Sequence, residues 1–218
     1  MPTILRSHMA RASVHRFLLA MVALGFGGLP LRATIVGFNQ IVTPEIQPTG
    51  VMALSAQFQH SWIGNSQQVQ FELGVTPRFE VGWFQGVKPG EGLGAAELNL
   101  WHEGPSLVTT GFINWSTRGG DAQPMLEYGF YQDSNACVAG VIYANRSTES
   151  LFGYRRQLND KLSVSFDFQA GPANSLTAGV TYNLTPTLCI NPAIYRTNSR
   201  RHHLLGYVVV TWNLTIWK

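Results

Sequence analysis

Apolar and polar residues alternate with a period of two along most of the chain after residue 50, and this alternation constrains the fold more than any other feature. Residues 162–169 read Leu-Ser-Val-Ser-Phe-Asp-Phe-Gln, and residues 52–62, 68–75, 175–184 and 206–216 follow the same pattern. Such spacing places alternate side chains on opposite faces of a β-strand. Weaker stretches of this kind lie at 79–85, 94–101, 107–115, 125–132, 137–144, 150–158 and 188–195. The pattern therefore predicts an all-β fold of twelve strands.

Three tight turns fix how neighbouring strands pair. Val75–Phe79, Leu158–Leu162 and Leu184–Leu188 each place three turn-forming residues between two apolar ones. Three-residue loops predict cross-strand pairs in which apolar residues face apolar residues: Leu73 with Val81, Phe71 with Trp83, Tyr154 with Phe166, Phe152 with Phe168, and Tyr182 with Ile190. A slip of one residue would turn every side chain to the wrong face, so the agreement supports three antiparallel hairpins.

The connections between the predicted strands fall into two classes. Those after even-numbered strands are compact, whereas several after odd-numbered strands are longer and polar, such as 86–92, 116–124 and 196–203. Short turns at one end and long loops at the other are typical of outer-membrane barrels with both termini on the periplasmic side. We therefore predict a single antiparallel transmembrane β-barrel of about 12 strands over residues 51–217. Residues 34–50 are expected to form a periplasmic lead-in.

The polar face of the strands separates a barrel from a soluble sheet protein. Charged residues make up only 12% of the chain, and the part after residue 33 contains three lysines, Lys88, Lys161 and Lys218. The polar phase consists mainly of Ser, Thr, Gln, Asn and Gly, which suits a narrow wet lumen better than a surface in bulk water. A secreted soluble β-sandwich, which also shows alternation, remains the alternative fold.

The first 33 residues differ in composition from the rest. They contain Arg6, Arg11, Arg16 and Arg32 and no acidic residue, so the chain from residue 34 carries 11 Lys/Arg against 12 Asp/Glu. An apolar run from Phe17 to Leu31 is too short for a membrane-spanning helix and is interrupted by glycines and Pro30. Residues 1–33 are predicted to be a signal peptide cut after Ala33. The near-neutral remainder has no basic stripe, which argues against nucleic-acid binding.

Two segments resemble a known family of outer-membrane proteins. Residues 43–50 (Thr-Pro-Glu-Ile-Gln-Pro-Thr-Gly) and the hairpin 71–82 (Phe-Glu-Leu-Gly-Val-Thr-Pro-Arg-Phe-Glu-Val-Gly) are similar to Gram-negative barrels of the MetA-pathway of phenol degradation family. The resemblance covers about the first third of the chain. It implies an outer-membrane barrel inserted by the barrel-assembly machinery, and it supplies no catalytic residues. The chain departs from the usual closing strand, because Trp217 is out of phase with Val208, Val210 and Trp212.

Charged and aromatic residues mark two candidate features of such a barrel. The six charged residues on the predicted lumen phase could select small polar or anionic solutes, or form an internal ion-pair network: Glu72, Glu80, Glu97, Glu127, Arg155 and Asp167. In the predicted register Arg155 is a diagonal neighbour of Asp167. An aromatic girdle towards the loop ends of the strands is expected from six further residues: Trp62, Trp83, Trp115, Tyr131, Tyr143 and Tyr195.

Other chemistry has weaker support in the sequence. A rim lipid hydrolase would need a serine and an acid beside His60, His202 or His203, and no nucleophile motif stands in the right context. Adjacent histidines point apart on an extended chain, so neither a metal site nor a cofactor is predicted. Cys137 and Cys189 are either a disulfide or, as we favour, two unpaired wall residues.

These observations give three hypotheses for a protein of the bacterial outer membrane. The first is a narrow passive channel or transporter for small solutes, and the second is a non-conducting structural or surface-interaction barrel. The third is the rim hydrolase, so an enzyme is not our expectation. The expected partners are outer-membrane lipid, the barrel-assembly machinery during biogenesis and small solutes.

Overall fold

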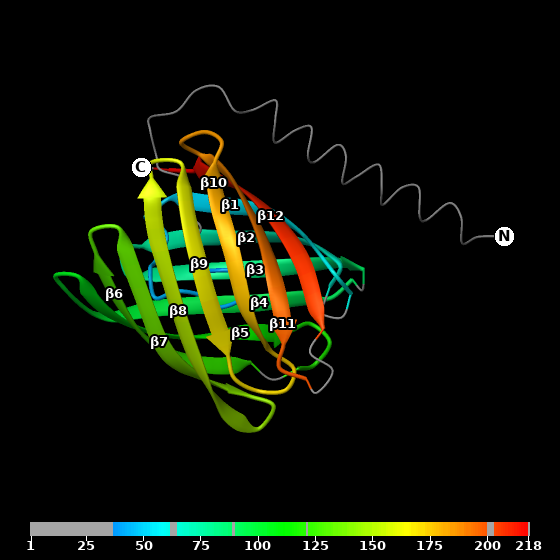
Figure 1. The fold of residues 1–218 in the computed structure, drawn as a ribbon. Helices are drawn as coiled ribbons and strands as arrows, with labels where there is room; N and C mark the ends of the chain where they lie inside the picture. The colour runs from blue at the N-terminus through cyan, green and yellow to red at the C-terminus, as the bar shows by residue number, and fades with distance from the viewer. Residues whose placement is uncertain (1–36, 62–64, 89, 121, 200–202, 218) are drawn as a thin grey trace. The chain divides into compact units, whose positions relative to one another are not determined.

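The computed structural model describes residues 37–61, 65–88, 90–120, 122–199 and 203–217, so the predicted signal peptide lies outside the described residues. Twelve strands follow one another along the described chain (Figure 1). They are β1 (Val51–Gln59), β2 (Gln67–Thr76), β3 (Phe79–Lys88), β4 (Gly92–Glu103), β5 (Ser106–Ser116), β6 (Gln123–Gln132), β7 (Asn135–Ala144), β8 (Ser147–Asn159), β9 (Leu162–Gln169), β10 (Ser175–Asn183), β11 (Leu188–Thr197) and β12 (Leu204–Thr215). The prediction of twelve strands is confirmed.

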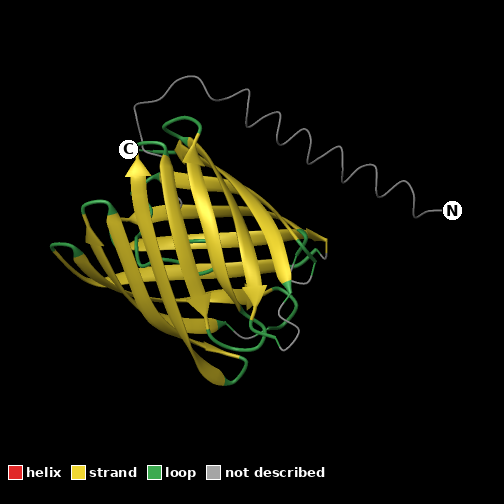
Figure 2. Cartoon of the chain, viewed as in Figure 1, coloured by secondary structure: helices red, strands yellow, loops and turns green. Residues whose placement is uncertain are grey.

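The sheet closes on itself. Every strand pairs antiparallel with its neighbours in sequence, and β1 pairs with β12 from Val51 opposite Thr215 to Gln59 opposite Tyr207. Closure leaves no edge strand, and it excludes the sandwich alternative. In Figure 2 the strands form one continuous ring, with β8–β11 in front of β2–β5.

The predicted hairpin registers are confirmed. Leu73 lies opposite Val81, Tyr154 opposite Phe166, and Tyr182 opposite Ile190. The structure extends most of the predicted strands by one to four residues, because the polar residues at the ends continue the backbone ladder. Bulges in β4 opposite β5, between Gly94 and Ala96 and between Asn99 and Trp101, were not predicted.

The two ends of the barrel differ as the sequence indicates, with two exceptions. Compact turns follow β2, β4, β6, β8 and β10, and longer connections follow β1, β5, β9 and β11. The prediction of a long loop at 86–92 is wrong, because β3 extends to Lys88 and β4 begins at Gly92, which leaves three connecting residues. The second exception is the β7–β8 turn at the long-loop end, which has only two residues, Asn145 and Arg146. Both have positive φ values, 52° and 62°, as in the type I′ turns that suit the right-handed twist of a hairpin.

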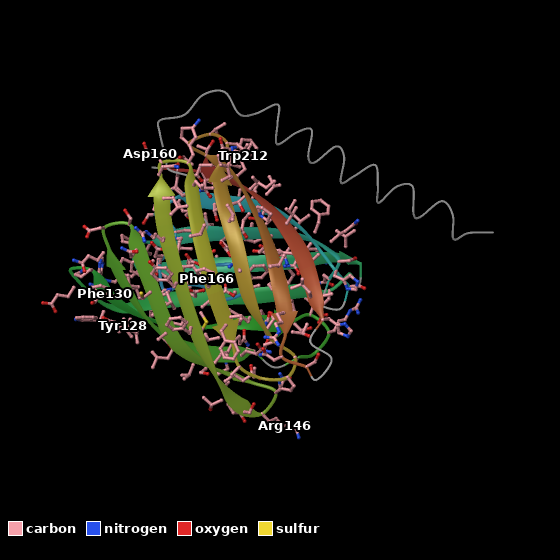
Figure 3. All side chains as sticks on the ribbon, in the orientation of Figure 1. Tyr128, Phe130, Arg146, Asp160, Phe166 and Trp212 are labelled. Atoms are coloured by element: carbon pink, nitrogen blue, oxygen red, sulfur yellow. The ribbon has the colours of Figure 1, made fainter. Side chains whose placement is uncertain are left out.

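The outer face of the barrel is apolar over most of its height. Large exposed side chains on it include Leu126, Val141, Phe152, Phe166 and Ile194. Figure 3 shows Phe166 on this wall, between Asp160 in a short turn and Arg146 at the opposite end. A surface with this many exposed apolar groups is typical of strands that face lipid. No helix within the described residues has the length and apolarity needed to cross a membrane.

The predicted aromatic girdle is wrong at Tyr131 and Tyr195, which face the lumen. Trp115 and Tyr143 are 58% and 52% exposed on the outer wall, and Trp83 shares the outward-facing phase of its strand with Val81. Tyr195, by contrast, is 3% exposed and stacks on Tyr207 inside the barrel, with ring centroids 5.0 Å apart. Tyr131 also packs inside, because odd residues of β6 face the lumen. Trp62 lies outside the described residues.

The segment before β1 does not form a periplasmic lead-in, so this prediction is also wrong. Residues 37–50 run inside the ring of strands, where Phe38, Ile41, Thr43 and Gln47 are buried. Phe38 and Ile41 join a cluster with inward-facing Val138 and Leu151. In sequence, residues 37–50 begin with apolar residues and continue with polar residues and prolines, which is typical of a linker. In the structure the same composition fits the lumen, because the lumen wall is apolar in one part and polar in another.

The strained β7–β8 turn yields a stability prediction. Replacing Arg146 with glycine should raise the free energy of unfolding by about 1 kcal/mol, because an L-residue with a side chain in the left-handed region costs roughly 1–2 kcal/mol. The measurement is the urea midpoint of the folded barrel in lipid vesicles. Arg118→Gly, at a loop position outside the left-handed region, removes the same charge and should give no gain; equal midpoints for both variants would contradict the explanation.

Candidate functional site in the lumen

The lumen contains one large cavity, which opens towards the long-loop end. Its volume is about 700 Å³, and its walls come from the long-loop halves of the strands, including Gln57 on β1, Gln70 on β2, Asn114 on β5 and Thr197 on β11. Residues 37–42 of the N-terminal segment line its inner side. We call this cavity the vestibule.

The six charged residues expected on the lumen phase all point inward. Glu80, Glu97, Glu127 and Asp167 are buried, Glu72 lines the vestibule, and Arg155 is half-buried. Five of the six are acidic, and they are not evenly spread. Glu72, Glu80, Glu97 and Glu127 stand on the wall formed by β2, β3, β4 and β6, whereas Asp167 stands on β9 across the barrel.

The first four form a wall of carboxylates with few partners. Glu80 lies directly opposite Glu97 in the β3–β4 ladder, an arrangement of like groups that disfavours two full charges. The backbone N–H of Gln47 donates to Glu80 Oε2 at 2.6 Å. Within the described part of the chain, Glu97 Oε2 and both carboxylate oxygens of Glu127 have no hydrogen-bond partner. Buried carboxylate oxygens of this kind need water, so this side of the lumen is a wet one.

A narrow space lies between the N-terminal segment and the carboxylate wall. Its volume is about 10 Å³, enough for a single water molecule, and it is bounded by Val42 of the segment and by Glu72, Glu80, Gly82 and Glu97. Glu72 and Phe84 line both this space and the vestibule. The carboxylate wall therefore joins the open and the constricted halves of the lumen.

Arg155 does not pair with Asp167 as the predicted register suggested. Its Nη2 lies 3.2 Å from Oε2 of Glu45 in the N-terminal segment, and its guanidinium lies 5.8 Å from the centre of the Phe38 ring. The sequence prediction missed this pair because it placed Glu45 outside the barrel. The pair ties the segment to β8.

Asn39 is the centre of the contacts that hold the segment. Its backbone N–H donates to Asp167 Oδ2 at 2.6 Å, and its backbone carbonyl accepts from the Tyr207 hydroxyl at 2.9 Å. Ser165 donates to its side-chain oxygen at 3.1 Å. Asp167 also accepts from the backbone N–H of Gln40 at 3.2 Å and from the Thr177 hydroxyl. The β9–β12 wall therefore satisfies the polar groups of Asn39 and the backbone N–H of Gln40, which water would otherwise bind.

Glycines on the lumen phase leave room for the segment. A Cβ at Gly153 would overlap the ring of Phe38, and a Cβ at Gly179 would overlap the side chain of Asn39. Gly129 faces Pro44, and Gly74 faces the backbone of Gln47, at similarly close range. These four glycines lie on β8, β10, β6 and β2. The site that holds the segment, which we call its seat, is therefore formed by strands far apart in the sequence.

Several residues that build this site were not singled out from the sequence. Asn39, Gln47, Asn191 and Tyr207 carry much of the hydrogen bonding, and Glu149 accepts from Gln169 and Asn174 at 3.0 and 2.8 Å. The sequence feature that could have predicted the segment's seat is the presence of Gly153 and Gly179 on the lumen phase. A glycine at such a position indicates that another part of the chain packs closely against the strand.

The remaining candidate residues contribute no second site. Cys137 and Cys189 are free, in agreement with the favoured prediction of unpaired wall residues. His202 lies outside the described residues, and the rim-hydrolase hypothesis stays untested. Within the described ranges, His, Cys, Asp and Glu do not gather in a group of three that could hold a metal ion.

The closed ring of twelve antiparallel strands and its polar lumen define the fold of the outer-membrane porin-like barrels. A solved KdgM porin superimposes with a TM-score of 0.55 at 8% identity, over 74% of this chain and 98% of the porin. The outer membrane protein Omp33 of Acinetobacter baumannii superimposes with a TM-score of 0.51 at 8% identity, over 78% of this chain and all of that protein. Neither a family model nor a curated protein matches the sequence.

The seat of the segment can be tested by filling it. Gly179→Val should displace Asn39, because the new side chain occupies the space of its carboxamide, and should cost about 1–3 kcal/mol through overpacking. Displacement exposes Glu45, so a glutamate-specific protease should then cut the folded barrel after this residue, as mass spectrometry would show. Gly206→Val is the matched control, since the nearest atom to its Cβ is 3.9 Å away. Equal cutting of the two variants would show that the segment is not held at Gly179.

Proposed function

We propose that this protein is a narrow passive channel for small solutes in the bacterial outer membrane. The observation that carries the proposal is the vestibule, an open polar cavity of about 700 Å³ enclosed by a barrel whose outer wall is apolar. A lipid-facing exterior around a wet interior is the arrangement through which polar solutes cross a bilayer. Kinship with the MetA-pathway family, resting on the hairpin 71–82, and insertion by the barrel-assembly machinery are part of the proposal.

The path through the channel follows the carboxylate wall. The N-terminal segment is bound to the opposite wall through Asn39 and Arg155, and it reaches the carboxylate side at Pro44, which accepts from Thr109, and at Gln47, which donates to Glu80. The narrow space beside Val42 therefore continues the vestibule towards the short-turn end. With room for about one water, it limits the channel to water and small ions while the segment is in place.

The charge of the path favours cations. Glu72, Glu80 and Glu97 line the constriction, and the one base among the six predicted lumen residues, Arg155, is paired with Glu45. Rings of carboxylates select cations, so an anionic solute is disfavoured. One structural neighbour, with a TM-score of 0.57 at 7% identity, is a KdgM porin in complex with disordered oligogalacturonate, an acidic saccharide. The lumen described here is unsuited to such a polyanion.

Single-channel recording in planar bilayers tests the proposed selectivity. We expect small ohmic steps and a reversal potential of the sign for potassium over chloride in a KCl gradient. Glu97→Gln should move this potential towards zero, because it removes a carboxylate from the constriction. Glu103→Gln, an exposed residue at the short-turn rim, should leave it unchanged. A wild-type channel that prefers chloride would refute the assignment of the carboxylate wall.

The position of the constriction can be tested independently. Gly82→Ala places a methyl group in the space beside Val42, where the new Cβ meets only ordinary contacts of 3.5–3.6 Å. It should therefore leave folding intact and reduce the conductance to a small fraction of the wild-type value, because the space holds about one water. Gly206→Ala is the control on the outer wall. Unchanged conductance in Gly82→Ala would place the path elsewhere in the lumen.

A non-conducting barrel is the second candidate, and the seated N-terminal segment favours it. Residues 38–47 contact β8–β12 and also β3, β5 and β6, so they cross most of the short-turn half of the lumen. Silence from well-folded wild-type protein, followed by conductance in Gly179→Val, would identify the segment as a permanent stopper. Silence from both proteins would support the structural barrel and reject the channel.

A further inference from the structure

The lining of the vestibule is unusually uniform in its chemistry. Thirteen of the described residues that line it carry side-chain carboxamides, and seven more carry hydroxyls. The only charged residues in the described lining are Glu72 and Glu91, and the Glu91 carboxylate accepts a hydrogen bond from the Ser116 hydroxyl. Carboxamides and hydroxyls are neutral groups that both donate and accept hydrogen bonds, so this lining favours uncharged, hydrogen-bonding ligands.

The carboxamides are arranged in hydrogen-bonded pairs around the wall. Gln70 donates to Gln57 at 2.5 Å, and Gln57 in turn donates to Gln59 at 2.7 Å. Across the cavity, Asn114 donates to Gln123 at 2.9 Å. These contacts fix the orientation of the groups, and each carboxamide, with two N–H donors and two acceptor lone pairs, keeps unused capacity that points into the cavity.

We propose that the vestibule is a binding site for neutral, polyhydroxylated solutes, that is, for short uncharged saccharides. A sugar hydroxyl is both a donor and an acceptor, and neighbouring hydroxyls match the paired donor and acceptor of a carboxamide. The apolar side chain of Phe84 in the same lining offers a surface for the C–H face of a sugar ring. This inference names what the vestibule of the proposed channel binds and so rests on that open lumen. It does not concern the constriction, which passes only water and small ions while the segment is in place.

The volume and charge of the vestibule narrow the class of saccharide that it can bind. A volume of about 700 Å³ lies within the range of 300–1,000 Å³ that is usual for small-molecule sites, and it admits two or three sugar rings. Acidic saccharides meet no basic side chain among the described lining residues and are repelled by Glu72. A cationic saccharide would be attracted by Glu72 and Glu91, but two carboxylates can pair with only part of a chain of charged rings, whereas twenty neutral polar side chains of the lining can pair with hydroxyls.

Calorimetric titration of the full-length barrel in detergent micelles tests the proposal without using conduction. The three probes are maltotriose, which is neutral, trigalacturonate, which is anionic, and the glucosamine trimer, which is cationic. Maltotriose should bind with an affinity that does not change between low and high salt, since no charge pairs form. A silent channel that binds maltotriose would reject the proposed conduction and leave this inference standing.

Matched variants locate the binding. Gln57→Leu combined with Gln70→Leu should weaken maltotriose binding about tenfold, as expected for the loss of two hydrogen bonds. Gln132→Leu, on the exposed end of β6, should leave it unchanged. The second pair, Asn114→Leu with Gln123→Leu, repeats the test if the first variant fails to fold, which the mobility of the unheated protein on a gel reports. No binding of maltotriose, unaltered binding in a folded variant pair, or tighter binding of either charged trimer would overturn the inference.

Discussion

The pairing of β1 with β12 is the constraint on which the other features of the structure depend. Backbone groups in hydrocarbon have no water to bind, so a sheet can cross a bilayer only when its first and last strands satisfy each other. Once the ring is closed, one face of every strand becomes an exterior and the other an interior of fixed width. The apolar wall, the carboxylate wall and the seat of the N-terminal segment all follow from that division.

The N-terminal segment fills part of the lumen, and the rest is left to water. The β9–β12 side presents hydroxyls, carboxamides and Asp167 to the backbone of residues 38–40, so this half of the lumen is occupied by the chain itself. The β2–β6 side presents carboxylates, and the segment satisfies Glu80 through the Gln47 N–H but leaves oxygens of Glu97 and Glu127 without a partner among the described residues. The segment is therefore held by more contacts on the β8–β12 side, and it reaches the opposite wall at Pro44 and Gln47. Beside Val42 it leaves a narrow space next to the carboxylates, and the proposed path depends on that space.

Similar barrels can serve different solutes because the lumen chemistry is independent of the closure. The solved porins share the ring of strands at 7–8% identity, so almost every lumen residue is free to differ. In this protein, carboxamides line the vestibule at the long-loop end and carboxylates line the narrow space nearer the short-turn end. The N-terminal segment contributes to both linings. Fold similarity therefore shows the barrel alone, and conduction and solute have to be argued from the side chains.

The sequence by itself determined the twelve strands, the registers of three hairpins and the compact turns after even-numbered strands. It also determined the inward direction of the six charged residues Glu72, Glu80, Glu97, Glu127, Arg155 and Asp167. These properties are local, because alternation and turn length act over a few residues. It did not determine the path of residues 37–50, the pairing of Arg155 with Glu45, or the fact that Tyr131 and Tyr195 face the lumen. Only the tertiary structure decided those, because the seat of the segment is assembled from Gly153, Gly179, Asp167 and Tyr207, which come together when the barrel closes.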